Sequence, residues 1–236
     1  MFDWLGVIVS PLNRVLFVVG ADHVTWAELL GFLTGGLCVW LTVRSSVLNF
    51  PVGILNSAFF LALFAYAALW ADAALQIVFI ALGGLGWWRW VRPGRARVVT
   101  VRWASSRTVV VCLAFVVVVT PLLTVVLRAA DDSAPFWDAL TTALSLAAQW
   151  LLNAKRVQTW WFWVAADLVY VPLYAAKHLT LTSAIYVLFF AMCLLGLKAW
   201  RAEAALVERA DVAELACDER ARASDGQVLS AAQRAP

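Results

Sequence analysis

The sequence predicts an all-α membrane protein with seven transmembrane helices in a 3+1+3 arrangement that contains two parallel repeats. Three observations lead to this fold class: the composition, the number of long apolar segments, and an internal repeat. The chain has 236 residues, of which 64% are hydrophobic and only 14% are charged. A soluble domain carries roughly a quarter charged residues, so this many apolar side chains indicate contact with lipid.

Seven segments are apolar and long enough to span a bilayer, which takes roughly 17–25 helical residues. They are residues 26–43, 50–69, 72–91, 107–128, 136–154, 159–176 and 180–199. Residues 1–25 form an N-terminal interfacial segment, for which we expect an amphipathic helix at the membrane surface. Residues 201–236 form a cytoplasmic tail, which we expect to be partly disordered: a solvated helix that frays into its last residues.

The basic residues of the loops predict the orientation of the chain. The connection after the third span carries six arginines: Arg89, Arg92, Arg95, Arg97, Arg102 and Arg107. Cytoplasmic loops are enriched in Lys and Arg, so this loop lies inside, the N-terminus outside and the C-terminus in the cytoplasm. The same charges need no nucleic acid as a partner, because topology and contact with lipid headgroups explain them.

An internal repeat emerges when the chain is compared with itself at an offset of 110 residues. The aligned identities include Trp40 with Trp150, Gly86 with Gly196, and Trp90 with Trp200. The first three-helix repeat is residues 26–91 and the second is residues 136–200. Residues 92–135 hold the basic cytoplasmic loop and an apolar linker helix, whose single crossing lets the two repeats run parallel. Repeats of this kind occur in transporters, with the substrate site near the midplane between them.

The sixth span carries most of the candidate site. Its polar and aromatic residues recur every three or four positions and therefore share one helical face: Trp160, Trp163, Asp167, Tyr170, Tyr174 and Lys177. Such a face suits a planar, partly polar ligand. As an alternative, Trp160 and Lys177 are interface anchors and the tyrosines pack between helices.

Asp167 lies near the middle of this span. A carboxylate there costs roughly 2.5–3.5 kcal/mol on insertion and usually marks a polar pathway. The alternative is a structural hydrogen bond between helices.

Neutral polar side chains in other spans complete the candidate site: Asn56, Gln76, Gln149 and Tyr186, the last being the repeat counterpart of Gln76. An amide in hydrocarbon without partners costs several kcal/mol, so these groups should face other helices or a cavity. Amides suit hydroxyl and carboxamide groups of a ligand better than ions. The alternative is that they serve only as hydrogen bonds between helices, worth about 0.6 kcal/mol each.

Several stretches in order resemble the bacterial vitamin transporters of the Pnu type: "NFPVGILNSAFF", "LWADAALQ", "GWWRW", "LSLAAQWLLNAKRVQTWWFW", "LYAAKHLTLTSAIY" and "GLKAW". The resemblance covers about residues 26–200. It implies a seven-helix fold similar to SWEET transporters, a homotrimer in the bacterial cell membrane, facilitated diffusion, and trapping of the vitamin by a cytoplasmic kinase. It also implies site roles for Asn56, Gln76, Gln149, Trp160, Trp163, Asp167, Tyr174 and Lys177.

The expected function is import of a heteroaromatic vitamin nucleoside, with nicotinamide riboside first and riboflavin or thiamine as alternatives. From another class, a membrane sensor that binds without transporting remains open. An enzyme is not expected, because the sequence has no nucleophile, base or metal motif of a known kind. We expect no cofactor and no metal.

Overall fold

The computed structural model describes residues 11–12, 14–19, 22–66, 69–92, 100–176 and 180–232. Within these residues a two-stranded antiparallel sheet precedes seven helices. The elements are β1 Val15–Val19, β2 Asp22–Thr25, α2 Trp26–Val43, α3 Asn49–Tyr66, α4 Trp70–Val91, α5 Ser106–Ala129, α6 Pro135–Asn153, α7 Thr159–Ala176 and α8 Thr180–Ala232.

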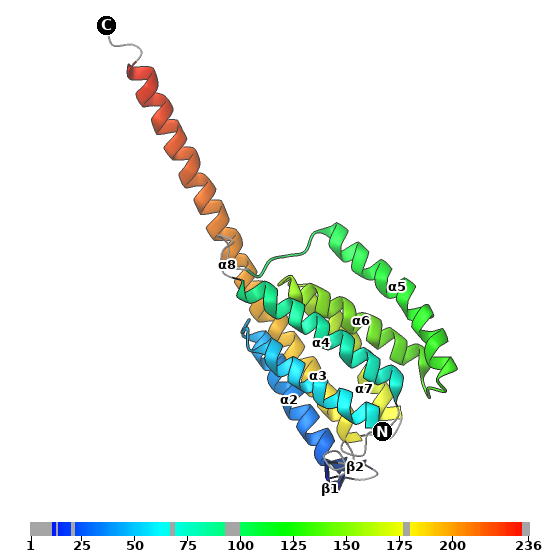
Figure 1. The fold of residues 1–236 in the computed structure, drawn as a ribbon. Helices are drawn as coiled ribbons and strands as arrows, with labels where there is room; N and C mark the ends of the chain where they lie inside the picture. Colours follow the sequence, from blue (N-terminus) through cyan, green and yellow to red (C-terminus); the bar gives the residue numbers. More distant parts are fainter. Residues whose placement is uncertain are drawn as a thin grey trace.

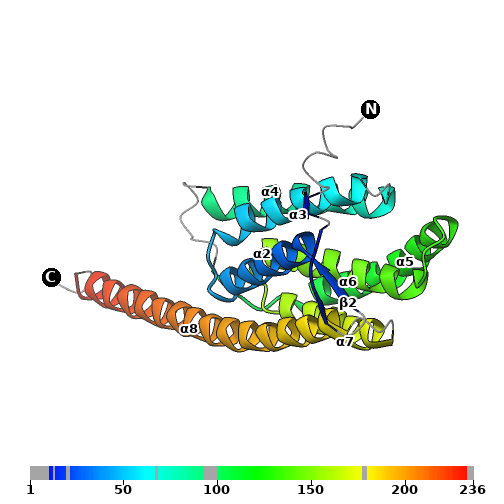
Figure 2. The same cartoon turned by 90° about the horizontal axis from the view of Figure 1, so that it is seen from below.

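Six of these helices form a bundle in which each half of the chain contributes three. In the first half α2 packs on α3 and α3 on α4, and in the second half α6 packs on α7 and α7 on α8. The halves meet where α2 contacts α8 and where α4 contacts α6. Helix α8 continues past the bundle at the end opposite the β1–β2 hairpin (Figures 1 and 2).

The prediction of seven helices is confirmed, and the bounds of α2 and α7 coincide with the predicted segments. Among the described residues, five helices are long and apolar enough to cross a membrane: α2, α3, α4, α5 and α8. Helices α6 and α7 also have at least 18 residues each, and α6 turns much of its surface inward. Ten residues of α6 are buried.

One expectation for the N-terminal end of the chain differs from the structure. The predicted amphipathic helix in the N-terminal segment is wrong for residues 15–19 and 22–25, which form the paired strands β1 and β2. The apolar run Val15–Val19 is rich in β-branched and aromatic residues, which favour a strand. At the other end α8 runs to Ala232, and its many Ala, Glu and Arg residues are strong helix formers. Partial disorder of the tail stays a prediction.

Local sequence signals explain where three helices begin. Thr25 caps α2 in a reciprocal pair with Glu28, in which each side chain accepts a backbone N–H of the other residue. Ser105 caps α5 by accepting from the N–H of Thr108. Pro135 occupies the first turn of α6, where its missing N–H leaves no helical hydrogen bond unmade.

Two turns that lie 110 residues apart in the sequence have the same backbone hydrogen bond. In the α2–α3 turn Ser45 N–H donates to the Thr42 carbonyl, and in the α6–α7 turn Lys155 N–H donates to the Leu152 carbonyl. Ser45 and Lys155 share a left-handed backbone, with φ of 52° and 49°. These residues are counterparts at that offset, so the sequence repeat corresponds to a repeated structure.

Aromatic packing repeats in the same way at this end of the bundle. Phe50 meets Trp90 edge to face at a centroid distance of 4.9 Å, and its counterpart Trp160 meets Trp200 in the same geometry at 5.6 Å. The two indole N–H groups then cross between the halves. Trp90 donates to the Asn153 carbonyl, and Trp200 donates to the Thr42 carbonyl.

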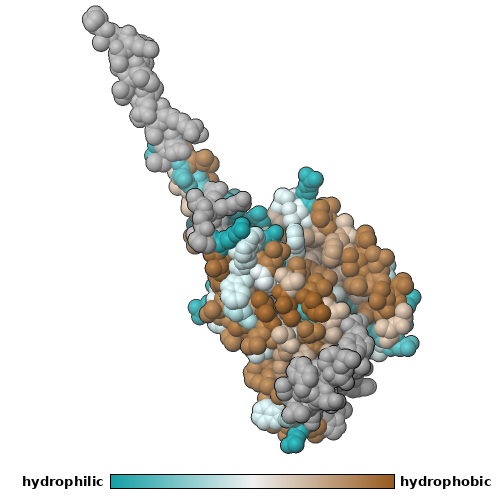
Figure 3. Space-filling model, viewed as in Figure 1, coloured by the Kyte–Doolittle hydropathy of each residue, from teal (hydrophilic) through white to brown (hydrophobic). Residues whose placement is uncertain are grey.

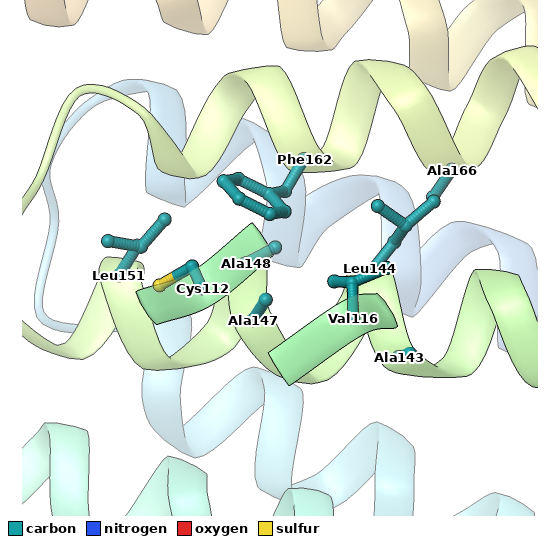
Figure 4. Close-up of a cluster of buried hydrophobic side chains, with 9 residues drawn as sticks. All are labelled: Cys112, Val116, Ala143, Leu144, Ala147, Ala148, Leu151, Phe162 and Ala166. Carbon is teal, nitrogen blue, oxygen red and sulfur yellow. The ribbon is translucent and has the colours of Figure 1, made fainter. Parts of the chain in front are cut away.

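Helix α5 lies to one side of the bundle (Figure 1) and packs on α6. It is buried along a single stripe of every fourth residue: Cys112, Val116, Thr120 and Thr124. Two of these residues join a buried apolar cluster with α6 and α7 (Figure 4). Apolar side chains cover much of the bundle surface seen in Figure 3. Such an extended apolar surface is what a lipid environment accommodates.

Candidate functional site

A cavity of about 290 Å³ lies inside the bundle. All six bundle helices, α2, α3, α4, α6, α7 and α8, contribute side chains to its wall, whereas no described residue of α5 does. The wall is mostly apolar with a small number of polar groups, as in typical sites for small ligands.

The wall is built from residues that are counterparts at the offset of 110. Five such pairs are Gly35 and Ser145, Val39 and Gln149, Gly53 and Trp163, Ser57 and Asp167, and Gly83 and Cys193. In these five pairs the second half supplies the larger or more polar side chain. Other pairs do not all follow this pattern, since Phe79 and Phe189 are identical and Thr42 is more polar than its counterpart Leu152, so the two halves of the wall differ only in part.

Asp167 carries the one acidic side chain in the wall. It is only 5% exposed, and the Cys193 thiol lies within hydrogen-bonding reach of its carboxyl group. Its Oδ2 atom has no hydrogen-bond partner among the described residues. A buried carboxylate oxygen without a partner is costly, so the site is suited to a ligand that brings a cation or a hydrogen-bond donor.

The two tryptophans of α7 that line the cavity occupy different environments. Trp160 is 1% exposed, and its ring packs edge to face on Trp200 and directly against the backbone at Gly196. Trp163 is partly buried and also lines the cavity. Both line the cavity, but Trp163 is the indole better placed to stack on a ligand ring.

Three tyrosines form a compact stack beside Asp167. The ring of Tyr186 lies 4.6 Å from that of Tyr170 and 5.1 Å from that of Tyr174. Tyr170 and Tyr186 line the cavity, whereas Tyr174 packs behind them. Negative ring faces next to a carboxylate make this part of the wall attractive to a positively charged group.

The amides of the wall are already engaged between or along helices. Asn56 Nδ2 donates to the Gly31 carbonyl at 3.1 Å and to Thr34 Oγ1 at 2.6 Å, which ties α3 to α2. Gln149 Nε2 donates to Asn153 Oδ1 at 3.2 Å. The amide nitrogen of Asn56 thus forms hydrogen bonds between helices, as the alternative interpretation expected. The residue also lines the cavity.

The structure brings seven of the ten predicted site residues into one wall: Asn56, Gln149, Trp160, Trp163, Asp167, Tyr170 and Tyr186. Gln76 is half-buried on α4 away from this wall, and Tyr174 is a neighbour of it. Lys177 lies outside the described residues.

Some polar wall residues were not among the predicted site residues, for example Thr42, Ser57 and Ser145. Small hydroxyl residues are common in membrane helices as packing residues, so their type alone gave no signal. The offset of 110 would have found one of them, because it pairs Ser57 with the predicted site residue Asp167.

Within the described part of the chain, no group of three or more His, Cys, Asp or Glu side chains is placed to hold a metal ion.

Comparison with known proteins gives concordant matches along most of the chain. The family model described as "Nicotinamide mononucleotide transporter" matches residues 25–202. The nicotinamide riboside transporter PnuC of Escherichia coli is 26% identical over 208 residues, which cover 77% of this chain and 87% of that protein. The riboflavin/roseoflavin transporter RibM of Streptomyces davaonensis is 27% identical over 195 residues, covering 80% and 91%.

A solved structure shares the fold. The crystal structure of the vitamin B3 transporter PnuC superposes with a TM-score of 0.61 at 19% identity, over 86% of this chain and 89% of that chain.

Proposed function

The chain belongs to the nicotinamide mononucleotide transporter family, and on that premise we propose that it imports nicotinamide riboside by facilitated diffusion. The membership confirms the resemblance drawn from the sequence motifs, and it makes the chain a multi-pass membrane protein of a vitamin transporter family. The choice of substrate within the family rests on the cavity.

The unpartnered Oδ2 of Asp167 is the observation that carries the choice. Nicotinamide riboside has a positively charged pyridinium ring, whereas riboflavin has a neutral ring system. A cation beside Asp167 and the Tyr170–Tyr186 pair would satisfy the carboxylate and gain from the aromatic faces. A neutral ring would leave the carboxylate without a counter-ion.

The size and shape of the cavity support the same substrate. A volume of about 290 Å³ lies just below the range of roughly 300–1,000 Å³ found for small-molecule sites, which favours a small ligand. In the proposed pose, Trp163 stacks on the ring. The side-chain amide oxygen of Asn56 and the side chain of Gln149 bind the ribose hydroxyls or the carboxamide of the ligand.

Transport is proposed to follow alternating access, with the two three-helix repeats of a SWEET-like 3+1+3 fold rocking about the cavity. The equivalent turns and aromatic pairs of the two halves support this mechanism, because they indicate that each half is a repeated three-helix unit that can move as one body. All seven helices then cross the membrane, with the N-terminus outside and the tail in the cytoplasm. A homotrimeric assembly and a cytoplasmic kinase that traps the vitamin complete the proposal.

Binding to purified protein tests the substrate. Isothermal titration calorimetry with nicotinamide riboside, riboflavin and thiamine is expected to show binding of nicotinamide riboside. Asp167→Asn should weaken it by about ten- to a hundredfold, the range for a lost hydrogen bond to a charged group. Asp72→Asn, the same change on α4 outside the cavity wall, is the matched control and should leave affinity unchanged.

A second pair of variants tests the stacking position. Trp163→Ala should weaken binding, whereas Trp161→Ala should not, because Trp161 is an exposed neighbour on the same helix. Tight binding of riboflavin or thiamine in place of nicotinamide riboside would contradict the proposal that nicotinamide riboside is the substrate. Binding of the vitamin without its transport into vesicles would favour the alternative that the protein is a membrane sensor.

Riboflavin is the second candidate because RibM is as similar to this chain as PnuC is, at 27% and 26% identity.

A further inference from the structure

A carboxylate of α8 is hydrogen-bonded to a turn of the first half and lies near the equivalent turn of the second half. Glu203 Oε2 accepts a hydrogen bond of 2.8 Å from Ser45 Oγ in the α2–α3 turn. Burial lowers the pKa of Lys155 in the α6–α7 turn, and the nearby Glu203 carboxylate offsets part of that shift. Ser45 and Lys155 are counterparts at the offset of 110, so Glu203 lies where the two halves approach each other.

A second carboxylate lies about two turns further along α8. Asp211 forms a two-bond ion pair with Arg102 of the α4–α5 loop, with Nη1–Oδ2 at 2.6 Å and Nη2–Oδ1 at 3.2 Å. The backbone of Arg102 is in turn bonded to the α6–α7 turn. Its N–H donates to the Lys155 carbonyl, and its carbonyl accepts from the Val157 N–H. Asp211 thereby connects α8 to two loops.

These polar contacts lie over a buried apolar cluster. Val101 of the α4–α5 loop, Val157, and both Trp200 and Ala204 of α8 belong to it. The same cluster contains three residues that also line the cavity: Leu152, Trp160 and Cys193. The cluster therefore borders the cavity at this end, and an opening through it has to separate α8 from the loops that Glu203 and Asp211 hold.

We propose that Glu203 and Asp211 form a latch that keeps this end of the cavity closed, and that release of their hydrogen bonds with Ser45 and Arg102 accompanies its opening. The two carboxylates then control access to the cavity without contacting the transported molecule. The latch uses only contacts within this chain, so it does not depend on which vitamin is carried.

Thiol labelling tests the latch on the full chain. Cys38 and Cys193 line the cavity, and Cys112→Ser with Cys217→Ser removes the remaining two cysteines. A membrane-impermeant maleimide is offered on the α8 side of oriented vesicles, without substrate, and the labelling rate is measured. Glu203→Gln and Asp211→Asn should each raise the rate about two- to fivefold, the range for losing one partly exposed ion pair.

Two controls separate the latch from general loosening of α8. Glu208→Gln changes an exposed carboxylate between the two latch residues on the same helix and should leave the rate unchanged. Arg102→Asp should raise the rate, and combining it with Asp211→Arg should bring the rate back toward that of the parent. This reversal also shows that the variants are folded.

The latch is overturned if Glu203→Gln and Asp211→Asn label at the parent rate, if Glu208→Gln labels as fast as they do, or if the reversed pair stays fast. Because no vitamin is present in the assay, failure of the latch is distinguishable from failure of the proposed substrate, and each can stand without the other.

Discussion

At the scale of single residues, the contrast between Asp167 and its counterpart Ser57 shows how the cavity acquires its charge. Both line the wall, yet only Asp167 brings a group that ionises. A single buried carboxylate without a full set of partners is expensive in a membrane, and a protein keeps such a group where a ligand uses it. A bound ligand that supplies a hydrogen-bond donor or a positive charge would thus offset the free-energy cost of burying the Asp167 carboxylate.

Substitutions at two glycines, Gly86 and Gly196, test the aromatic packing that is repeated in the two halves. A methyl group at Gly86 would overlap the Phe50 ring, and one at Gly196 would overlap the Trp160 ring, whereas nothing lies within 4 Å of one at Gly84. Gly86→Ala and Gly196→Ala should each lower the free energy of unfolding by about 1–3 kcal/mol through overpacking. Gly84→Ala should be neutral or raise it by up to about 1 kcal/mol, since it adds helix propensity.

Reversible unfolding of the purified protein in mixed micelles measures these changes. Equal stability of the Gly84→Ala and Gly86→Ala proteins would show that the helices can move apart without cost, contrary to the tight packing at Phe50.

Sequence reasoning found the residues whose type is unusual in a membrane. Asp167, Asn56 and Gln149 stand out because polar groups are rare there, and all three line the cavity. The burial of Trp160 was not foreseeable from its helical face. Its environment depends on Gly196 and Trp200, which lie some 36 and 40 positions further along the chain and meet it only after folding.

At the scale of elements, α5 behaves differently from the six bundle helices. Its buried residues recur every fourth position, and the remaining face is exposed, with Val117 72% exposed. A helix that contacts one neighbour along a narrow stripe leaves the rest of its surface to lipid or to another copy. Its almost purely apolar sequence agrees with this placement.

The exposed face of α5 can be tested with one position. Val117→Lys places a charge near the middle of the helix, which costs roughly 2.5–3.5 kcal/mol on insertion scales. It should sharply lower the fraction of α5 that inserts in a glycosylation-reporter assay, whereas Val117→Leu should insert as the parent does. Full insertion of the lysine variant would mean that this face meets water or a polar partner.

The first and last residues of a helix could be predicted from the sequence where polar turn residues flank an apolar run. Helix α2 begins at its Thr25 cap and α7 spans the predicted segment. The hairpin before α2 was missed because an apolar run of five residues fits either a strand or a helical turn. Pairing with β2 decides between them, and pairing is a tertiary contact.

At the scale of the whole molecule, the proposed uniport predicts how flux responds to ion gradients. Asp167 is the only acidic side chain in the cavity wall, and a single carboxylate that balances a cationic substrate has no capacity left for a co-transported ion. Uptake of labelled nicotinamide riboside into proteoliposomes should therefore continue when sodium and proton gradients are collapsed. A strict requirement for either gradient would contradict facilitated diffusion.

The unequal halves of the cavity wall also limit how a ligand can be oriented. A cavity with identical groups in both halves would offer two equivalent poses, related by the pseudo-symmetry of the repeats. Here Ser57 stands where its counterpart is Asp167, and Gly53 where its counterpart is Trp163, so the two poses are no longer equivalent. The difference between the halves gives the enclosure one polarity, and a ligand bound in it would therefore have one preferred orientation.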